Sequence, residues 1–296
     1  MKQILFLLMA IFLSMNVAAM TKDKPVQVII PFGPGGGTDA IFRKLQRYGE
    51  DRNITMIPVY RPGAQGLIGM QTLYEAEPNG LTIGVITFDT VTLWNNKTAV
   101  DMRGIINIQK NIFGVVTTKN GSLTQLVNNS TEKNPLKIGY LLASQKVIME
   151  KTVKILGIKQ DPIYVPYKSG SDLMQNVIGG DLDIGITSLN VLAPLIKTNK
   201  MRLLATDSAP MDEFPSAISL NAYDPSIGAI NKGSSIVLPP NSSPESIKFW
   251  KEFVKGYLSD PMVKADSTIN YWEPVSKTLK ELEKDLEENT KILKQP

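Results

Sequence analysis

The sequence of 296 residues contains no histidine and no cysteine. Their absence excludes a serine–histidine–aspartate triad, a thiolate nucleophile, an imidazole base, a disulfide and the common kinds of zinc site. Catalysis by paired carboxylates, by a serine–lysine dyad or with bound Mg²⁺ stays open. The search for functional groups therefore turns to backbone amides, hydroxyls and carboxylates.

A large excess of one charge is also absent. Lys and Arg number 32 and Asp and Glu number 28, which leaves a net charge of +4 at pH 7. Because the basic residues do not cluster, we expect no nucleic-acid partner. Hydrophobic residues make up 43% and charged residues 20% of the chain, a composition typical of globular proteins. The length predicts two domains, each able to bury a core.

The first twenty residues have the pattern of a cleavable export signal. Lys2 precedes the apolar run 4–13, and Val17 and Ala19 stand at the −3 and −1 positions of a signal-peptidase site. The apolar run is about ten residues long, whereas a membrane span needs roughly twenty, so an anchor is the less favoured alternative. A chain without cysteine also cannot carry a lipoprotein anchor. We expect residues 1–19 to be removed and the mature protein to be free in a bacterial periplasm, without a lipid anchor.

Strand-like and helix-like runs alternate along the rest of the chain, which predicts two α/β units with right-handed crossovers and mainly parallel sheets. The predicted strands cover 26–31, 57–60, 81–87, 136–140, 163–165, 183–187 and 202–205. The predicted helices cover 40–48, 65–77, 145–156, 171–178, 191–198, 246–258 and the tail from Leu279 to Leu293.

Two further β-rich runs, 112–118 and 235–238, are interpreted as strands that cross between the units. The first lobe would then comprise residues 20–117 and 235–296, and the second lobe residues 118–234. A chain that leaves one lobe, builds the other and returns makes two connections. Two connections form a hinge, which lets lobes close around a ligand.

The segment from Pro31 to Asp39 is rich in glycine and joins a predicted strand to a predicted helix. Exposed N–H groups and the positive end of a helix dipole make such a turn an anion site. A dinucleotide fingerprint that starts at Gly33 fails at Thr38, and one that starts at Gly35 meets Ala40, which the looser form allows, but no acidic residue ends the second strand. A phosphate-binding P-loop is excluded because the Gly-Lys-Ser/Thr ending is missing. A tight turn capped by Asp39 is the structural alternative.

Other strand-to-helix turns also present hydroxyls, amides or backbone donors, at 61–66, 87–90, 142–145, 166–170 and 187–188. Ligands of open α/β sheets bind beyond the carboxyl ends of the strands, so these turns are expected to meet at one cleft. For any single side chain, a helix cap or a loop hydrogen bond is an equally good interpretation.

Four ordered runs in the sequence carry a family resemblance. They are VQVIIPFGPGGGTDAIFRKLQ, VYRPGAQGLIGMQTLYEAEPNGLTIGV, VPYKSGSDLMQNVIGGDLDIGI and LAPLIKTNKMRLLAT, followed by the late segment IVLPPNSSPESIKFW. From about Val26 onward the chain resembles the substrate-binding proteins of the tripartite tricarboxylate transporter family, also called Bug receptors.

The resemblance implies an α/β, two-lobed periplasmic binding protein of the Venus flytrap, type II-like class, and not an enzyme. It implies a monomer that binds a small carboxylate without a cofactor or metal and delivers it to the permease subunits of a membrane transporter. In that family, backbone N–H groups and waters hold the carboxylate. The expected ligand-binding residues are Phe32, Gly33, Gly35, Gly36, Gly37, Thr38, Asp39, Gly63, Gln65, Phe88, Asp89, Ala143, Ser144, Gln145, Tyr167, Lys168, Ser169, Thr187 and Ser188.

The sequence departs from the family pattern at two places. Tyr140, Leu141 and Leu142 replace a turn that is usually rich in glycine and serine, which predicts a smaller site or an apolar end in place of a polar one. Thr187 stands where the family often has an acidic residue, which argues against an amino-acid ligand.

Two alternatives compete with the transport receptor. An exported binding protein of the same kind could present its ligand to a sensor. An exported hydrolase could use Ser130 and Lys133, which have serine–lysine spacing, but this segment is polar and loop-like and lacks the accompanying motifs.

Overall fold

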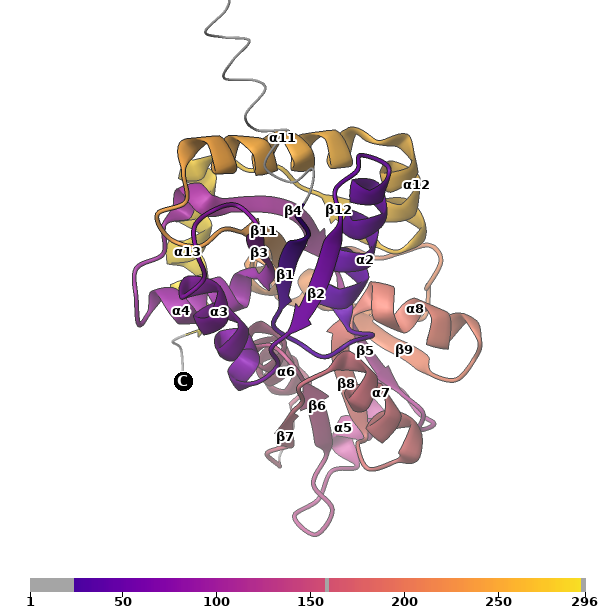
Figure 1. Ribbon diagram of the computed structural model, residues 1–296. Coiled ribbons are helices and arrows are strands. Elements are labelled where there is room, and N and C mark those ends of the chain that lie inside the picture. Colours follow the sequence, from indigo (N-terminus) through magenta and orange to yellow (C-terminus); the bar gives the residue numbers. More distant parts are fainter. Residues whose placement is uncertain (1–23, 158–159, 294–296) are drawn as a thin grey trace, which may run out of the picture.

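Two six-stranded sheets organise the chain, one in each of two lobes (Figure 1). The structure, a computed structural model, describes residues 24–157 and 160–293. The predicted signal peptide, residues 1–19, lies outside the described residues. Within the described ranges, no helix is long and apolar enough to cross a membrane.

The sheet of lobe 1, sheet A, has the strand order β12-β4-β11-β3-β1-β2. Strand β1 pairs in parallel with β2 and β3, while β11 runs antiparallel to β3 and β4, and β12 runs antiparallel to β4. The strands are β1 (Val26–Ile30), β2 (Met56–Tyr60), β3 (Thr82–Thr87), β4 (Ile105–Asn111), β11 (Gly233–Val237) and β12 (Trp272–Pro274).

The sheet of lobe 2, sheet B, has the order β10-β9-β5-β8-β6-β7. Strand β6 is parallel to β7 and β8, and β10 is parallel to β9, whereas β5 is antiparallel to β8 and β9. The strands are β5 (Phe113–Thr117), β6 (Lys137–Tyr140), β7 (Ile163–Pro166), β8 (Ile184–Ser188), β9 (Arg202–Thr206) and β10 (Ile218–Ser219).

The two-lobed α/β architecture is confirmed, and both sheets are mixed: sheet B has more parallel than antiparallel pairs, whereas sheet A has more antiparallel pairs than the prediction of a mainly parallel sheet implied. Most of the parallel pairs belong to strand–helix–strand units. Except for the β12–β4 pair, the antiparallel pairs arise where a strand enters from the other lobe, since β11 inserts between β3 and β4, and β5 inserts between β8 and β9. Residues 113–117, which the sequence placed at the end of lobe 1, form β5 and pair with β8 and β9 of sheet B.

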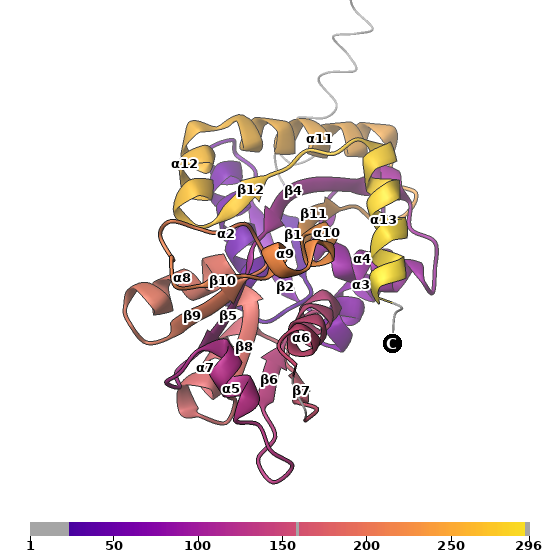
Figure 2. The same cartoon turned by 180° about the vertical axis from the view of Figure 1, so that it is seen from behind.

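Amphipathic helices cover both faces of sheet A (Figures 1 and 2). Buried residues of α2 and α11 join one core cluster, and those of α3, α4 and α13 join another. On α2 the predicted apolar positions Ile41, Phe42 and Leu45 are almost fully buried, and each such side chain contributes about 1.5–3 kcal/mol. The lobe 1 helices are α2 (Gly37–Glu50), α3 (Leu67–Tyr74), α4 (Phe88–Asn95), α11 (Pro244–Ser259), α12 (Pro261–Ile269) and α13 (Leu279–Leu293), with short 3₁₀ turns at Ala64–Gly66 and Met102–Gly104.

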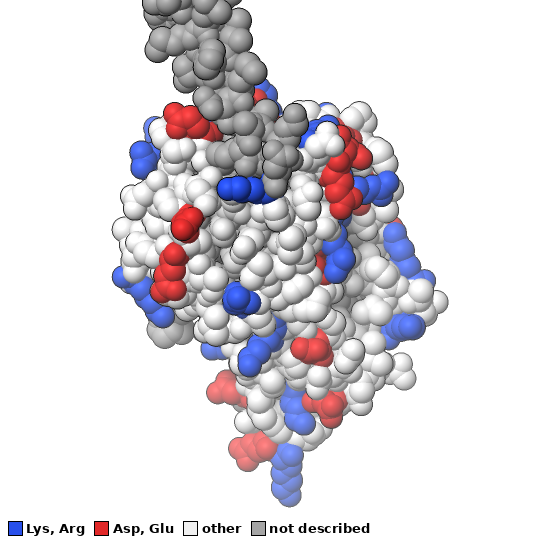
Figure 3. Space-filling view, in the orientation of Figure 1, with Lys and Arg blue, Asp and Glu red and all other residues white. Residues whose placement is uncertain are grey.

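Lobe 2 packs around a single large core cluster. Its helices and those of the returning connection are α5 (Leu123–Asn128), α6 (Ala143–Ile155), α7 (Gly170–Gly179), α8 (Leu189–Lys197), α9 (Leu220–Tyr223) and α10 (Pro225–Ala229). Acidic and basic side chains are interspersed on the face seen in Figure 3.

The two connections between the lobes lie side by side and are bonded to each other. On the first connection, the Phe113 N–H donates to Asp207 Oδ1 at 2.9 Å, and the Asn111 N–H donates to the carbonyl of Lys232 at 3.2 Å. A buried ion pair joins Lys232 Nζ and Asp207 Oδ2 at 2.8 Å. The hinge is therefore cross-linked by polar contacts, and removing either charge would leave the other buried without its partner.

Candidate functional site

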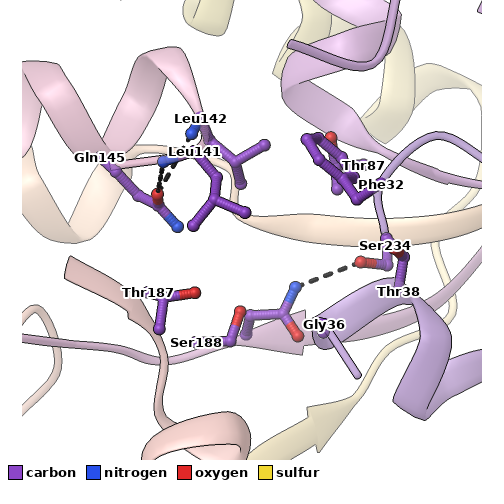
Figure 4. Close-up of a pocket in the computed structure, with 12 residues that line it drawn as sticks. Phe32, Gly36, Thr38, Thr87, Leu141, Leu142, Gln145, Thr187, Ser188 and Ser234 are labelled. Carbon is purple, nitrogen blue, oxygen red and sulfur yellow. Dashed lines mark hydrogen bonds between the residues drawn. The ribbon is translucent and has the colours of Figure 1, made fainter. Parts of the chain in front are cut away.

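A cavity lies between the lobes at the carboxyl ends of the central strands (Figure 4). Its free volume of about 30 Å³ is room for a few water molecules. Among the described residues, those that line it carry no charge. They are Phe32, Gly36, Gly37, Thr38, Thr87, Asn111, Leu141, Leu142, Gln145, Thr187, Ser188 and Ser234.

The N-termini of two helices, one from each lobe, border this cavity. Helix α2 follows Gly36 and helix α8 follows Ser188, and neither residue provides a side-chain cap. The two termini are close, because a Cβ added to Gly37 would lie 3.3 Å from Ser188 Oγ. The α2 terminus presents N–H groups to the cavity, whereas at α8 the Leu189 N–H already donates to the carbonyl of Ile112 at 2.7 Å. Both termini bring the positive ends of their helix dipoles to the cavity, so their convergence favours an anion.

Thr38, in the first turn of α2, adds a hydroxyl to this end of the cavity. The residue is 4% exposed, and its Oγ1 has no hydrogen-bond partner among the described residues. A buried hydroxyl without a partner costs free energy unless a ligand or a water satisfies it.

The glycine loop also brings the lobes into contact. The Gly33 N–H donates to the carbonyl of Lys168 at 3.1 Å, and Ser171 Oγ donates to the carbonyl of Pro34 at 2.9 Å. A Cβ on Gly33 would lie 2.8 Å from the Cβ of Ser169, so only glycine allows this approach. Part of the loop therefore serves lobe closure and does not line the cavity.

The N-terminus of α6 is occupied by side chains of the protein itself. Gln145 Oε1 accepts from the N–H groups of Leu141 at 2.8 Å and Leu142 at 3.1 Å (Figure 4). Asp89 of lobe 1 accepts from the Ser144 N–H at 2.7 Å through Oδ2. The backbone donors predicted at 143–145 are therefore partly satisfied without a ligand.

Asp89 is 1% exposed, and its Oδ1 has no partner among the described residues. Burial raises the pKa of this carboxyl to about 6, although the hydrogen bond from Ser144 opposes the shift. The Asp89 carboxyl therefore links the two lobes by a hydrogen bond, while its burial disfavours the charged form.

Asp39 fixes the conformation of the glycine loop through hydrogen bonds. Its carboxylate accepts from the Gly35 N–H at 2.8 Å, from Tyr60 OH at 2.7 Å and from Arg43 Nε at 3.0 Å. Burial alone would raise the pKa of Asp39, but these hydrogen bonds outweigh it and hold the pKa below the usual value. Asp39 therefore has a structural role in the loop, although the N-cap of α2 is Gly36 and not Asp39, as the capped-turn alternative required.

Seven of the expected ligand-binding residues line the cavity: Phe32, Gly36, Gly37, Thr38, Gln145, Thr187 and Ser188. The other twelve do not line it: Gly33, Gly35, Asp39, Gly63, Gln65, Phe88, Asp89, Ala143, Ser144, Tyr167, Lys168 and Ser169. Phe88 lies in the apolar core with no exposed surface. Gly63 has a φ of 131° and packs on Ile68, and the carbonyl of Gln65 accepts from Thr90 Oγ1 at 3.0 Å.

Five lining residues are absent from the predicted set: Thr87, Asn111, Leu141, Leu142 and Ser234. The two leucines were noted as departures from the family pattern, and they supply the apolar wall of the cavity. Asn111 and Ser234 flank the two connections, and Asn111 Nδ2 donates to Ser234 Oγ at 3.2 Å. In the sequence, these two residues were marked as site candidates only by their position next to the predicted crossing strands.

Sequence comparison identifies one family of receptor proteins. Residues 32–293 match the sequence profile of the tripartite tricarboxylate transporter family receptor. A UPF0065 protein from the tcbD-tcbE intergenic region of Pseudomonas sp. strain P51 is 23% identical over 65% of this chain, a match that spans 60% of that protein's length. A UPF0065 protein of Bordetella bronchiseptica is 23% identical over 87% of this chain and 81% of its own.

Solved structures share the fold. The periplasmic binding protein BugD superposes with a TM-score of 0.77 at 16% identity, covering 92% of this chain and 95% of its own. MatC from Rhodopseudomonas palustris, solved with bound malate, has a TM-score of 0.76 at 14% identity and covers 91% of this chain and 99% of its own.

Proposed function

The chain belongs to the tripartite tricarboxylate transporter receptor family, and we propose that it binds a small carboxylate between its lobes and delivers it to the permease of such a transporter. The convergence of the uncapped N-termini of α2 and α8 on a cavity whose lining carries no charge supports this proposal. Helix dipoles and hydroxyls can hold an anion without a charged partner. The ligand bound to MatC, malate, is a carboxylate as well.

The two ends of the cavity differ in polarity, and this difference restricts the class of ligand that fits. We propose that the carboxylate lies against the N–H groups of Gly37 and Thr38 and the hydroxyls of Thr187 and Ser188. The opposite wall is formed by Phe32, Leu141 and Leu142, and behind it the N–H groups of Leu141 and Leu142 already donate to Gln145. An apolar group fits this wall better than a second carboxylate, so the proposed ligand is a small monocarboxylate.

Closure around the ligand would use the hinge at Ile112 and Lys232. In this proposal lobe 1 consists of the residues before Ile112 and after Lys232, and lobe 2 of those between. The lobes would part to admit the ligand, because the cavity between them has room for only a few water molecules. The receptor would act as a monomer in the periplasm and release its ligand to the permease.

A thermal-shift screen of the chain from Met20 onward tests this function. Monocarboxylates of increasing alkyl length would be compared with dicarboxylates, tricarboxylates and organic amines. A ligand at 100 times its dissociation constant adds about 2.7 kcal/mol of stability, which is readily measured. We expect the short monocarboxylates to give the largest shifts and mass spectrometry to recover them chemically unchanged. Stabilisation by amines with none by carboxylates would refute the anion site, and conversion of the ligand would indicate an enzyme.

A further inference from the structure

Gln145 bonds the backbone at the start of α6 through only one end of its carboxamide group. Its Oε1 accepts from the N–H groups of Leu141 at 2.8 Å and Leu142 at 3.1 Å. The oxygen of a carboxamide accepts hydrogen bonds, whereas its nitrogen only donates them. The two backbone donors therefore fix which end of the amide faces the helix, and Nε2 must point the other way.

The free end, Gln145 Nε2, lies on the side of the amide that faces the cavity between the lobes (Figure 4). The residue as a whole is buried, with 1% of its surface exposed. None of the described residues accepts a hydrogen bond from Nε2, yet this atom keeps surface that solvent can reach. A molecule in the cavity can therefore contact Nε2, and only an acceptor atom can pair with it.

The side chains around this end of the cavity do not provide that acceptor. Phe32, Leu141 and Leu142 are apolar, and Asn111 Oδ1 already accepts from Gln109 Nε2 at 2.5 Å. A ligand alkyl group placed here would displace water from Nε2 without replacing its hydrogen bond. Such a loss weakens binding by about tenfold or more, and a ligand oxygen at the same place avoids it.

We propose that Gln145 selects ligands that carry an oxygen in addition to their carboxylate, so that the bound molecule is a short keto or hydroxy monocarboxylic acid. This inference rests on the receptor function proposed above and narrows its ligand class. The keto or hydroxyl oxygen accepts from Gln145 Nε2, while the carbon groups face Phe32 and the two leucines. Because the free volume is about 30 Å³, this oxygen belongs near the carboxylate, on the second or third carbon.

Calorimetric titration of the chain from Met20 onward with propanoate, pyruvate, lactate and 3-hydroxypropanoate tests this selection without any substitution. These acids share a carboxylate and a three-carbon skeleton and differ in the added oxygen. We expect at least one oxygenated acid to bind about tenfold or more tightly than propanoate. Equal affinities would mean that a water molecule serves as the acceptor for Nε2, which overturns this inference and leaves the receptor function standing. Binding of none of these acids would overturn both.

Gln145→Glu separates the donor from the structural role of the residue. The new carboxylate can still accept from the N–H groups of Leu141 and Leu142, but at about pH 8 it has no hydrogen to donate to the cavity. Its charge weakens binding of every acid, so the readout is the ratio of affinities for the preferred oxygenated acid and for propanoate, in which this shared loss cancels. We expect the ratio to fall to about one or below.

Ser188→Ala is the matched control. In the proposed site the Ser188 hydroxyl contacts the carboxylate that all the acids share, so this variant should bind each of them more weakly and keep the ratio. A ratio that survives in Gln145→Glu, or that disappears equally in Ser188→Ala, would refute the assignment to Gln145. The comparison of acids on the parent protein decides the matter even where a variant fails to fold.

Discussion

The N-termini of α2 and α6 occupy equivalent places in the two lobes, but their N–H groups have different hydrogen-bond partners. Each follows a parallel strand of its lobe and points toward the space between the lobes. At α2 the N-cap is Gly36, without a side chain, and the nearby Thr38 hydroxyl has no partner among the described residues. At α6, Gln145 and Asp89 already accept from the backbone. A helix N-terminus is thus open to a ligand only where the chain supplies no acceptor of its own.

Blocking the open terminus should have the largest effect. In Gly36→Val the φ of −85° suits any residue, although the new Cβ would lie in tight contact, 3.3 Å from the carbonyl oxygen of Gly33, which would have to shift slightly. The valine methyl groups would occupy the carboxylate position. We expect affinity for the carboxylate to fall at least about 100-fold, or about 2.7 kcal/mol, in calorimetric titrations. The control Gly179→Val, at the far end of α7, should bind normally; equal loss in both variants would mean a folding defect.

Neutralising the carboxyl at the occupied terminus should stabilise the protein. The pKa of Asp89 is about 6 in the folded state and 3.8 in the unfolded chain, so the folded state holds the proton more tightly. The free energy of unfolding therefore falls as pH rises through this window, by about 3 kcal/mol in all. Asp89→Asn keeps an acceptor for the Ser144 N–H and removes this loss.

Urea denaturation at about pH 4 and about pH 7.5 measures the difference. We expect the Asp89→Asn variant to be more stable than the parent protein at the higher pH and similar at the lower one. Asp39→Asn is the matched control, and its effect should have the opposite sign, because hydrogen bonds hold the pKa of Asp39 below its usual value. A pH dependence that Asp89→Asn leaves unchanged would contradict the assignment.

The contrast between the termini also shows what the sequence could predict. The spacing of Ile41, Phe42 and Leu45 predicted α2 correctly, because one face of that helix is buried and the other is not. Helix α4 was missed because its polar residues Asp89, Thr90 and Thr92 are buried together with its apolar ones, so no apolar periodicity marks the helix. Strand β4 was missed because Asn107 and Gln109 are polar residues on a buried strand, which disguises its apolar character.

Local turn chemistry at the site was predictable, and long-range pairing was not. The anion site at the glycine loop stays a prediction, and it could be made from the sequence because the N–H donors of the loop are consecutive in the chain. The Gln145 contacts were also local, since Gln145 lies three residues after Leu142 and its side chain accepts from the N–H of this N-cap residue, which is one half of a capping box. By contrast, Asp89 and Ser144 lie 55 positions apart and meet only when the lobes pack together.

Opening the occupied terminus should turn it into a weak anion site. Gln145→Ala leaves the buried N–H groups of Leu141 and Leu142 without their acceptor, at a cost of about 1–3 kcal/mol. We expect sulfate to recover part of this stability in thermal denaturation, by binding the freed N–H groups. Gln125→Ala removes a similar capping contact from the exposed start of α5, where water replaces it, so sulfate should have no added effect. Equal sulfate responses in the two variants would refute the comparison.

The smallest effect should come from the hydroxyl at the open terminus. Thr38→Val keeps the shape of the side chain and removes the buried Oγ1 that has no partner among the described residues. If this hydroxyl donates to the ligand carboxylate, its loss should weaken binding by about 1 kcal/mol, or roughly fivefold, without lowering stability. Thr92→Val is the matched control, because the Thr92 hydroxyl already donates to the carbonyl of Phe88 at 2.8 Å. The Thr92→Val variant should lose stability and keep its affinity for the carboxylate. The opposite responses of the two variants would show that the Thr38 hydroxyl binds the ligand and that the Thr92 hydroxyl stabilises the fold.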